Sequence, residues 1–80
     1  MGKIAKTLNS MDELERVIKT AINANASLSL FISMPGFPEP EIITNPAINL
    51  EKKLEYYKST YDDNLEHKYA KGVKIIGWAE

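Results

Sequence analysis

Cysteine is absent from the 80-residue chain. Disulfide bonds, thiolate metal sites and thiol catalysis are therefore excluded, although this absence does not identify the redox compartment. A glycine-rich phosphate loop and the nucleophile elbow of serine hydrolases are also missing from the sequence. We therefore expect a protein that is not an enzyme and carries no cofactor.

The sequence also lacks a long apolar run and an excess of basic residues. No segment approaches the length of a membrane span, and the first eight residues lack the apolar run of a signal peptide. We accordingly expect a cytoplasmic protein without a membrane partner. Ten basic and eleven acidic residues give a net charge of -1, whereas nucleic-acid-binding proteins usually carry a basic patch that neutralises phosphates. Nucleic acid is therefore not the expected partner.

The composition that remains is that of a folded domain. Hydrophobic residues make up 44% of the chain and charged residues 26%, as in ordinary globular proteins. We expect one α+β domain over residues 1 to 80, in which a single small core gives modest stability. Self-association would increase that stability.

The first helix is predicted to begin after Ser10. Ser10 and Glu13 have the spacing of a capping box, in which the serine hydroxyl caps the helix and the glutamate bonds the backbone N–H of the cap. Apolar residues then recur at helical spacing and predict one buried stripe, formed by Leu14, Val17, Ile18, Ala21 and Ile22.

Residues 27 to 45 are predicted to form a hairpin. Between residues 27 and 33 leucine and isoleucine alternate with serine, except that Phe31 lies on the serine side. Residues 34 to 40 contain three prolines and a glycine, which suit a stiff turn. Residues 41 to 44 then resume a strand pattern.

The longest predicted element is a second helix that ends near residue 69. Asn45 suits its N-cap with Pro46 at the first helical position, and Asn49 is a second candidate for the cap. The apolar stripe of this helix consists of Leu50, Leu54, Tyr57, Tyr61 and Leu65. A last strand follows over residues 73 to 79.

A helix of this length would be longer than the strands beside it. At about 1.5 Å per helical residue and about 3.3 Å per strand residue, one end of the helix would overhang the sheet. Tyr61, Leu65 and Tyr69 would then meet another subunit. The alternative is that residues 62 to 64 break the helix and remove the overhang.

The order of these elements predicts an α+β fold with an antiparallel sheet and two helices on one face. If residues 3 to 8 form a first strand, with Ile4 as its main apolar residue, the order is βαββαβ, the ferredoxin-like arrangement. Without that strand the order is αββαβ. One face of the sheet stays free of helices in either case.

The face without helices is predicted to carry the contact residues. Strict alternation along the last strand places Ile76 and Trp78 on this face, beside Phe31 and with Ile43 as a further candidate. Two aromatic rings with isoleucine would form an apolar patch of roughly several hundred Å², a size that usually marks a contact site. Phe37 at the hairpin tip would insert into a pocket of the partner or would pack on its own loop. We expect binding of a protein partner, or a homodimer, through Phe31, Phe37, Ile76 and Trp78.

Other interpretations stay open. The N-terminal segment or the proline-rich turn would cover the patch in one of them. In another, Phe31 and Trp78 would stack on the bases of single-stranded nucleic acid, as sheet-based RNA-binding modules do. Asp63 and His67 are one helical turn apart and would together bind a metal ion, although a solvated histidine near a helix end is the simpler explanation.

Four motifs lie between residues 41 and 78. They are Asn45-Pro46, Lys53-Leu54-Glu55-Tyr56-Tyr57-Lys58, Tyr61-Asp62-Asp63-Asn64-Leu65 and Lys71-Gly72-Val73-Lys74-Ile75-Ile76-Gly77. In this pattern the chain resembles short uncharacterised proteins encoded by phages and prophages of Gram-positive bacteria. The resemblance implies a small phage accessory protein in the cytoplasm of the bacterial host, acting by binding a host or phage protein. It implies no particular catalytic or binding residues.

Overall fold

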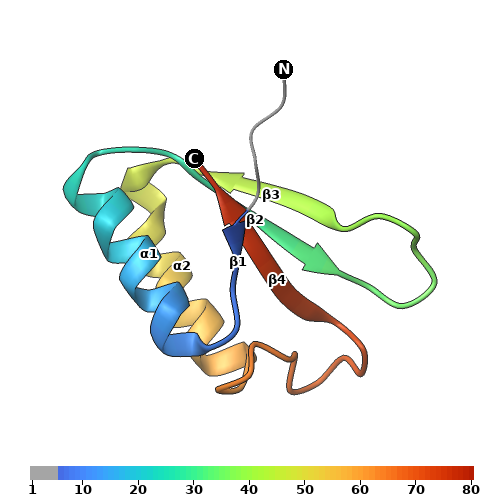
Figure 1. Ribbon diagram of the computed structural model, residues 1–80. Helices are drawn as coiled ribbons and strands as arrows, with labels where there is room; N and C mark the ends of the chain where they lie inside the picture. Colours follow the sequence, from blue (N-terminus) through green and yellow to red (C-terminus); the bar gives the residue numbers. More distant parts are fainter. Residues whose placement is uncertain (1–5) are drawn as a thin grey trace.

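The computed structural model describes residues 6 to 80, and its elements follow the order βαββαβ. The strands are β1 (Lys6–Thr7), β2 (Leu28–Ser33), β3 (Glu41–Asn45) and β4 (Lys74–Ala79), and the helices are α1 (Met11–Asn23) and α2 (Ala47–Thr60). Both helices lie on one side of a four-stranded antiparallel sheet (Figure 1). The predicted α+β fold is therefore confirmed. Residues 3 to 5 of the predicted first strand, including Ile4, lie outside the described residues.

The strand order of the sheet is β1-β4-β2-β3. One βαβ unit, formed by β1, α1 and β2, has β4 inserted between its two strands. The second unit, formed by β3, α2 and β4, has β2 inserted in the same way. Two interleaved split units of this kind are compatible with the predicted ferredoxin-like arrangement. The strands that follow the helices therefore lie at the centre of the sheet, and β1 and β3 lie at its edges.

The start of α1 agrees with the prediction. The Ser10 hydroxyl accepts a hydrogen bond from the Glu13 backbone N–H at 3.2 Å, which satisfies one free donor of the first turn. The Glu13 carboxylate accepts a hydrogen bond from the backbone N–H of Asn9 at 2.8 Å. The glutamate thus reaches one residue further upstream than in the capping box that the sequence predicted.

The start of α2 differs from the prediction. Asn45 is the last residue of β3, where it pairs with Leu28, so it does not cap the helix. Pro46 occupies the N-cap position instead, and its carbonyl accepts a hydrogen bond from the Asn49 N–H at 3.0 Å. Because proline offers no side-chain acceptor, this helix start depends on backbone geometry and packing.

The end of α2 comes nine residues earlier than predicted, at Thr60 rather than near residue 69. The Asp62 carboxylate accepts hydrogen bonds from the backbone N–H groups of Asn64 and Glu66, at 2.9 and 3.0 Å, and so stabilises a turn that leaves the helix axis. The alternative in which residues 62 to 64 break the helix is therefore correct. Neither α1 nor α2 is long and apolar enough to cross a membrane.

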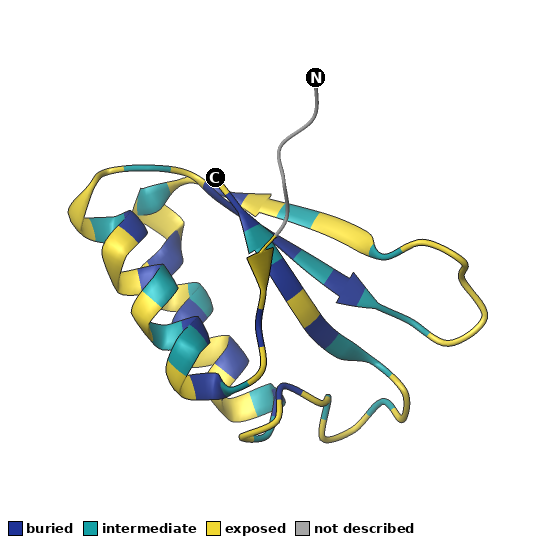
Figure 2. Cartoon of the chain, viewed as in Figure 1, coloured by how far each residue is buried: buried dark blue, intermediate teal, exposed yellow. Residues whose placement is uncertain are grey.

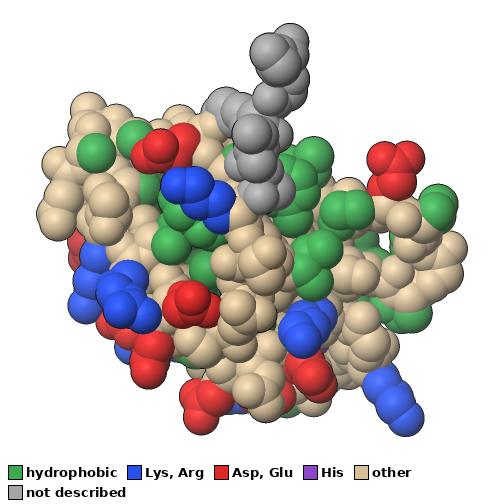
Figure 3. All heavy atoms as spheres, in the orientation of Figure 1, with side chains coloured by type: hydrophobic (Ala, Val, Ile, Leu, Met, Phe, Trp, Pro, Cys, Tyr) green, Lys and Arg blue, Asp and Glu red, His purple; other side chains and the backbone are tan. Residues whose placement is uncertain are grey.

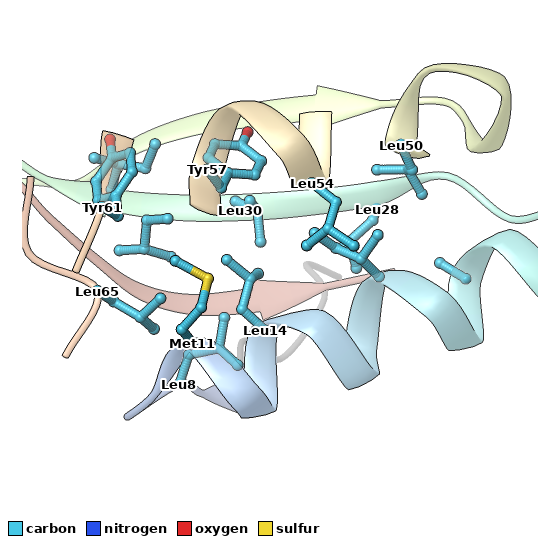
Figure 4. Close-up of a cluster of buried hydrophobic side chains, with 14 residues drawn as sticks. Leu8, Met11, Leu14, Leu28, Leu30, Leu50, Leu54, Tyr57, Tyr61 and Leu65 are labelled. Atoms are coloured by element: carbon cyan, nitrogen blue, oxygen red, sulfur yellow. The ribbon is translucent and has the colours of Figure 1, made fainter. Parts of the chain in front are cut away.

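The core lies between the sheet and the two helices (Figures 2 and 4). Leu14 of α1, Leu30 of β2 and Tyr57 of α2 are at most 1% exposed in it. Tyr61 and Leu65 also point into this core, with exposed fractions of 5% and 0%. The expected contact of these two residues with another subunit is therefore wrong. Leu65 reaches the core from a left-handed turn, with φ of 65°, and not from a helix. Tyr69, the third residue expected to contact another subunit, is 79% exposed on the loop after α2.

Candidate functional site

Strand pairing assigns each side chain to one face of the sheet, because directly paired residues point to the same side. Leu30 is buried against the helices and pairs with Ile43 of β3 on one side and with Trp78 of β4 on the other. Ile43 and Trp78 therefore belong to the face that the helices cover. Their predicted placement on the opposite face is wrong.

A β-bulge in β4 explains the error at Trp78. Ile75 and Gly77 pair with consecutive residues of β2, so Ile76 between them is an extra residue. Strict alternation would put Ile75 and Trp78 on opposite faces, but the extra residue brings both of them to the helix side. The bulge thus separates Trp78 from Ile76.

Trp78 is partly buried between the sheet and α1. Its side chain packs against the core, and it borders a hollow of about 250 Å³ that Val17 and Leu28 also line. The Lys6 Nζ lies 5.1 Å from the centre of the indole ring, within the range of a cation–π interaction. Trp78 is thus a packing residue. Since Phe31 points to the other face, the two aromatic side chains cannot stack on bases on one surface of the sheet.

The face without helices carries a row of residues that crosses all four strands. Thr7, Gly77, Phe31 and Ile42 pair successively from β1 to β3, and Ile76 lies beside them in the bulge. We call these five residues the open-face patch. Ile42 is 58% exposed, Ile76 is 37% exposed and Phe31 is partly buried. Of the four residues predicted from the sequence, the structure therefore brings two together here, Phe31 and Ile76.

A shallow hollow of about 250 Å³ lies within this patch. Its lining consists of Lys6, Thr7, Phe31, Pro40, Ile76 and Gly77. Pro40 is the contribution of the proline-rich turn, which borders the patch and leaves Ile42 and Ile76 exposed. In Figure 3 hydrophobic side chains gather over the strands, whereas charged ones lie mostly over the helices and the lower loop.

Polar groups flank the patch at both ends. Toward one end the hydroxyls of Ser29 and Thr44 are hydrogen-bonded to each other at 2.8 Å. Toward the other end Ser33 pairs with Lys74. Among the described residues that strand pairing assigns to this face, Lys74 is the only charged one. With Lys6, which lines the hollow, the described part of the open face thus has two charged residues, in a chain of which 26% is charged.

The one acidic residue of β3 points away from the open face. Glu41 pairs with Ile32, whose side chain is buried under the helices. The pKa of Tyr61 on the helix side is raised chiefly by burial, then by Tyr56 and by the negative charge of Glu41. This influence agrees with a carboxylate on the helix side of the sheet.

Ile42 is the surface residue that the sequence reasoning missed, since it named Ile43 instead. The residue pair nearest the hairpin turn is Ile32 with Glu41. The next pair is Phe31 with Ile42, so the side chain of Ile42 lies on the same face as that of Phe31. A slip of one residue in the hairpin register exchanges Ile42 and Ile43 between the faces. The length of the turn between the strands is therefore the signal that could have identified Ile42.

Phe37 lies apart from the other predicted contact residues. It is 66% exposed at the hairpin tip, and its N–H donates to the Met34 carbonyl at 3.3 Å. This exposure rules out the interpretation in which Phe37 packs on its own loop. It is also absent from the lining of the open-face hollow.

His67 and Asp63 have roles in holding the loop that follows α2. The His67 Nδ1 accepts hydrogen bonds from the backbone N–H groups of Tyr69 and Ala70, at 3.0 and 2.9 Å. The Asp63 carbonyl accepts a hydrogen bond from the Met11 N–H at 2.9 Å, which ties this loop to α1. Within residues 6 to 80 no group of three or more His, Cys, Asp or Glu could hold a metal ion.

Comparison of the chain with models of protein families, with curated proteins and with solved structures finds no match. The resemblance to phage-encoded proteins therefore stays a prediction. The candidate site rests on the geometry of the open face alone.

Proposed function

We propose that the protein is a small non-enzymatic accessory protein that binds a protein partner, or a second copy of itself, through the open face. The observation that carries this proposal is a sheet face without helices on which Phe31, Ile42 and Ile76 gather. Water solvates such an apolar surface poorly, so covering it with a partner lowers the free energy.

The hollow in the open-face patch favours a partner with one apolar anchor. Phe31, Pro40 and Ile76 are apolar residues of its lining, and about 250 Å³ is room for an aliphatic side chain. Lys6 lines this hollow and Lys74 lies at one end of the face, so both favour an acidic residue in the partner near that anchor. We therefore expect the contact segment of the partner to be apolar with an acidic flank.

The size of the face favours a transient contact. With strands about 4.8 Å apart and residues about 3.3 Å apart, strands of two, six, six and five residues give the sheet a face of roughly 300 Å². Stable interfaces usually bury about 800 Å² on each partner. A partner bound through this face alone would therefore exchange readily.

The side chains of the open face support a binding role over catalysis. Ser29 and Thr44 hydrogen-bond to each other, so neither hydroxyl is held by a general base. The His67 Nδ1 accepts hydrogen bonds from backbone N–H groups in the loop after α2. Together with the predicted phage relationship, this leads us to propose a phage accessory protein that acts in the cytoplasm of a bacterial host.

Photochemical cross-linking in cells that express the protein tests this proposal. Ile76 is replaced by p-benzoylphenylalanine, and the matched control carries the same group at Lys52, which is exposed on α2. We expect one defined protein to cross-link from position 76 and not from position 52, and the added change Ile42→Ser to reduce the yield several-fold. Equal labelling from both positions, or none from position 76, would overturn the proposal.

A further inference from the structure

Strand β3 forms an edge of the sheet and pairs with β2 alone among the described strands. Its outer side therefore presents backbone N–H and C=O groups that another strand can pair with. The residues of β3 are Glu41, Ile42, Ile43, Thr44 and Asn45.

Two of the features that natural proteins use to prevent strand addition are absent from this edge. Lysine is absent from β3, and its pairing with β2 runs through five residues without a bulge. Three consecutive β-branched residues favour an extended backbone, and Ile42 among them is 58% exposed. Pro40 and Pro46 bound the strand and limit any added pairing to these five residues.

We propose that a second copy of the chain pairs with this edge, β3 against β3 and antiparallel, with Ile43 of one copy opposite Ile43 of the other. In this register Glu41 faces Asn45 of the second copy, and Ile42 faces Thr44. All five residues are paired, and no charge lies opposite a like charge. A register centred on Glu41 would instead oppose two carboxylates.

The sequence of β3 is thus complementary to itself, which argues for a second copy over a foreign peptide. The two β3 strands have the same length and each is followed by proline, so no residue of either strand is left unpaired in this register. The product is a continuous eight-stranded sheet in which the two open faces adjoin at Ile42 and Thr44. The use of this doubled face for a partner rests on the proposed function, whereas the dimer itself does not.

Single cysteines test the register, because the chain has no cysteine of its own. We expect Ile43→Cys to form a disulfide-linked dimer under mild oxidation, since this residue meets itself across the two-fold axis. Ile42→Cys and Thr44→Cys should each stay unlinked alone and form a mixed disulfide when the two variants are combined. Lys52→Cys, on the outside of α2, is the control that should stay unlinked.

Charge pairs at exposed positions test the contact without disturbing the core. In the double variant Ile42→Lys with Thr44→Lys, introduced lysines oppose each other across the dimer. In Ile42→Lys with Thr44→Glu, lysine opposes glutamate. We expect the dimer dissociation constant of the first variant to exceed that of the second by about tenfold or more at low salt, and the difference to shrink at high salt. Light scattering over a concentration series measures the dissociation constants of both variants at each salt concentration.

Three results would overturn the proposed dimer. These are a monomer at every concentration without cross-linking at position 43, self-linking of Ile42→Cys, and equal dissociation constants for the two charge variants. Circular dichroism confirms in each case that the variant is folded. Because position 76 lies two strands away from the β3 edge, photocross-linking from that position without the change Ile42→Ser reports on the proposed function independently.

Discussion

Phe31 and Gly77 are paired residues at the centre of the open face, and Gly77 is buried although it has no side chain. An aromatic ring beside a strand glycine shields the backbone and offsets the poor strand propensity of glycine. We therefore predict that Phe31→Ala lowers the free energy of unfolding by about 1 to 3 kcal/mol, as measured by urea denaturation. Ile42→Ala is the control on the same face and should cost less than about 1 kcal/mol. Equal losses in the two variants would contradict the shielding role.

Trp78 and Ile76 should respond in opposite ways to replacement by serine. Trp78→Ser removes a ring that packs against the core, so we predict a loss of about 2 to 4 kcal/mol in the free energy of unfolding. Ile76→Ser changes a bulge residue that is 37% exposed, and we expect a loss below about 1 kcal/mol with an unchanged circular dichroism spectrum. Thermal and urea melts give both values. A stable Trp78→Ser variant would show that the bulge assignment is wrong.

His67 should stabilise the loop after α2 through its Nδ1 atom. We predict that His67→Ala lowers the free energy of unfolding by about 1 to 2 kcal/mol, because two backbone N–H groups lose their acceptor. Asparagine places a carbonyl oxygen near the same position, so His67→Asn should recover most of the loss. Amide hydrogen exchange should accelerate at Tyr69 and Ala70 in the alanine variant. Unchanged exchange at these two amides would contradict this role.

Tyr57 should make the fold sensitive to alkali. Burial, with smaller contributions from Tyr61 and Tyr56, raises the pKa of Tyr57 from 10.0 to about 12. Between these values the unfolded chain has lost the phenolic proton and the folded chain retains it. Because the folded state then binds more protons, its stability is complete below pH 10 and falls as the pH rises toward 12.

The change Tyr57→Phe tests this dependence. The Tyr57 hydroxyl is buried without a hydrogen-bond partner among the described residues, so its removal should leave stability at pH 7 unchanged or raise it by up to about 1 kcal/mol. We expect the loss of stability above pH 10 to be weaker than in the unchanged protein, as followed by urea denaturation at several pH values. Tyr69→Phe, at a position that is 79% exposed, should leave the pH profile as it was. A profile that is equally steep in the Tyr57 variant would contradict the assignment.

Features of the fold that depend on neighbouring residues could be predicted from the sequence. The hydroxyl of Ser10 and the run of prolines in the hairpin turn act over a few residues, so the start of α1 and the hairpin were identified. The apolar stripe of the second helix was also correct as a set of core residues. Its last members, Tyr61 and Leu65, continue the helical spacing after the helix has ended.

Features that depend on distant pairing could not be predicted. The spacing of Leu65 is that of a helix, but its burial comes from a turn that Asp62 stabilises. The face of Trp78 depends on an extra residue in β4, and that residue is extra only in relation to β2. The same holds for Ile42, whose face is set by the register of the hairpin. The sequence therefore predicted an apolar sheet face without helices as the candidate site. Two of the four predicted residues, Phe37 and Trp78, lie elsewhere.

Strand β4 is the last of the elements that the structure describes along residues 6 to 80, yet it lies between β1 and β2 in the sheet. During synthesis on a ribosome, β1 has no neighbouring strand to pair with until residues 74 to 79 have left the exit tunnel. The nascent chain therefore holds α1 and the hairpin without the strand that joins them, and its apolar surfaces stay available to chaperones until β4 has left the tunnel. Completion of the sheet also requires contacts over long sequence separations, which slows folding relative to a helical bundle of the same size.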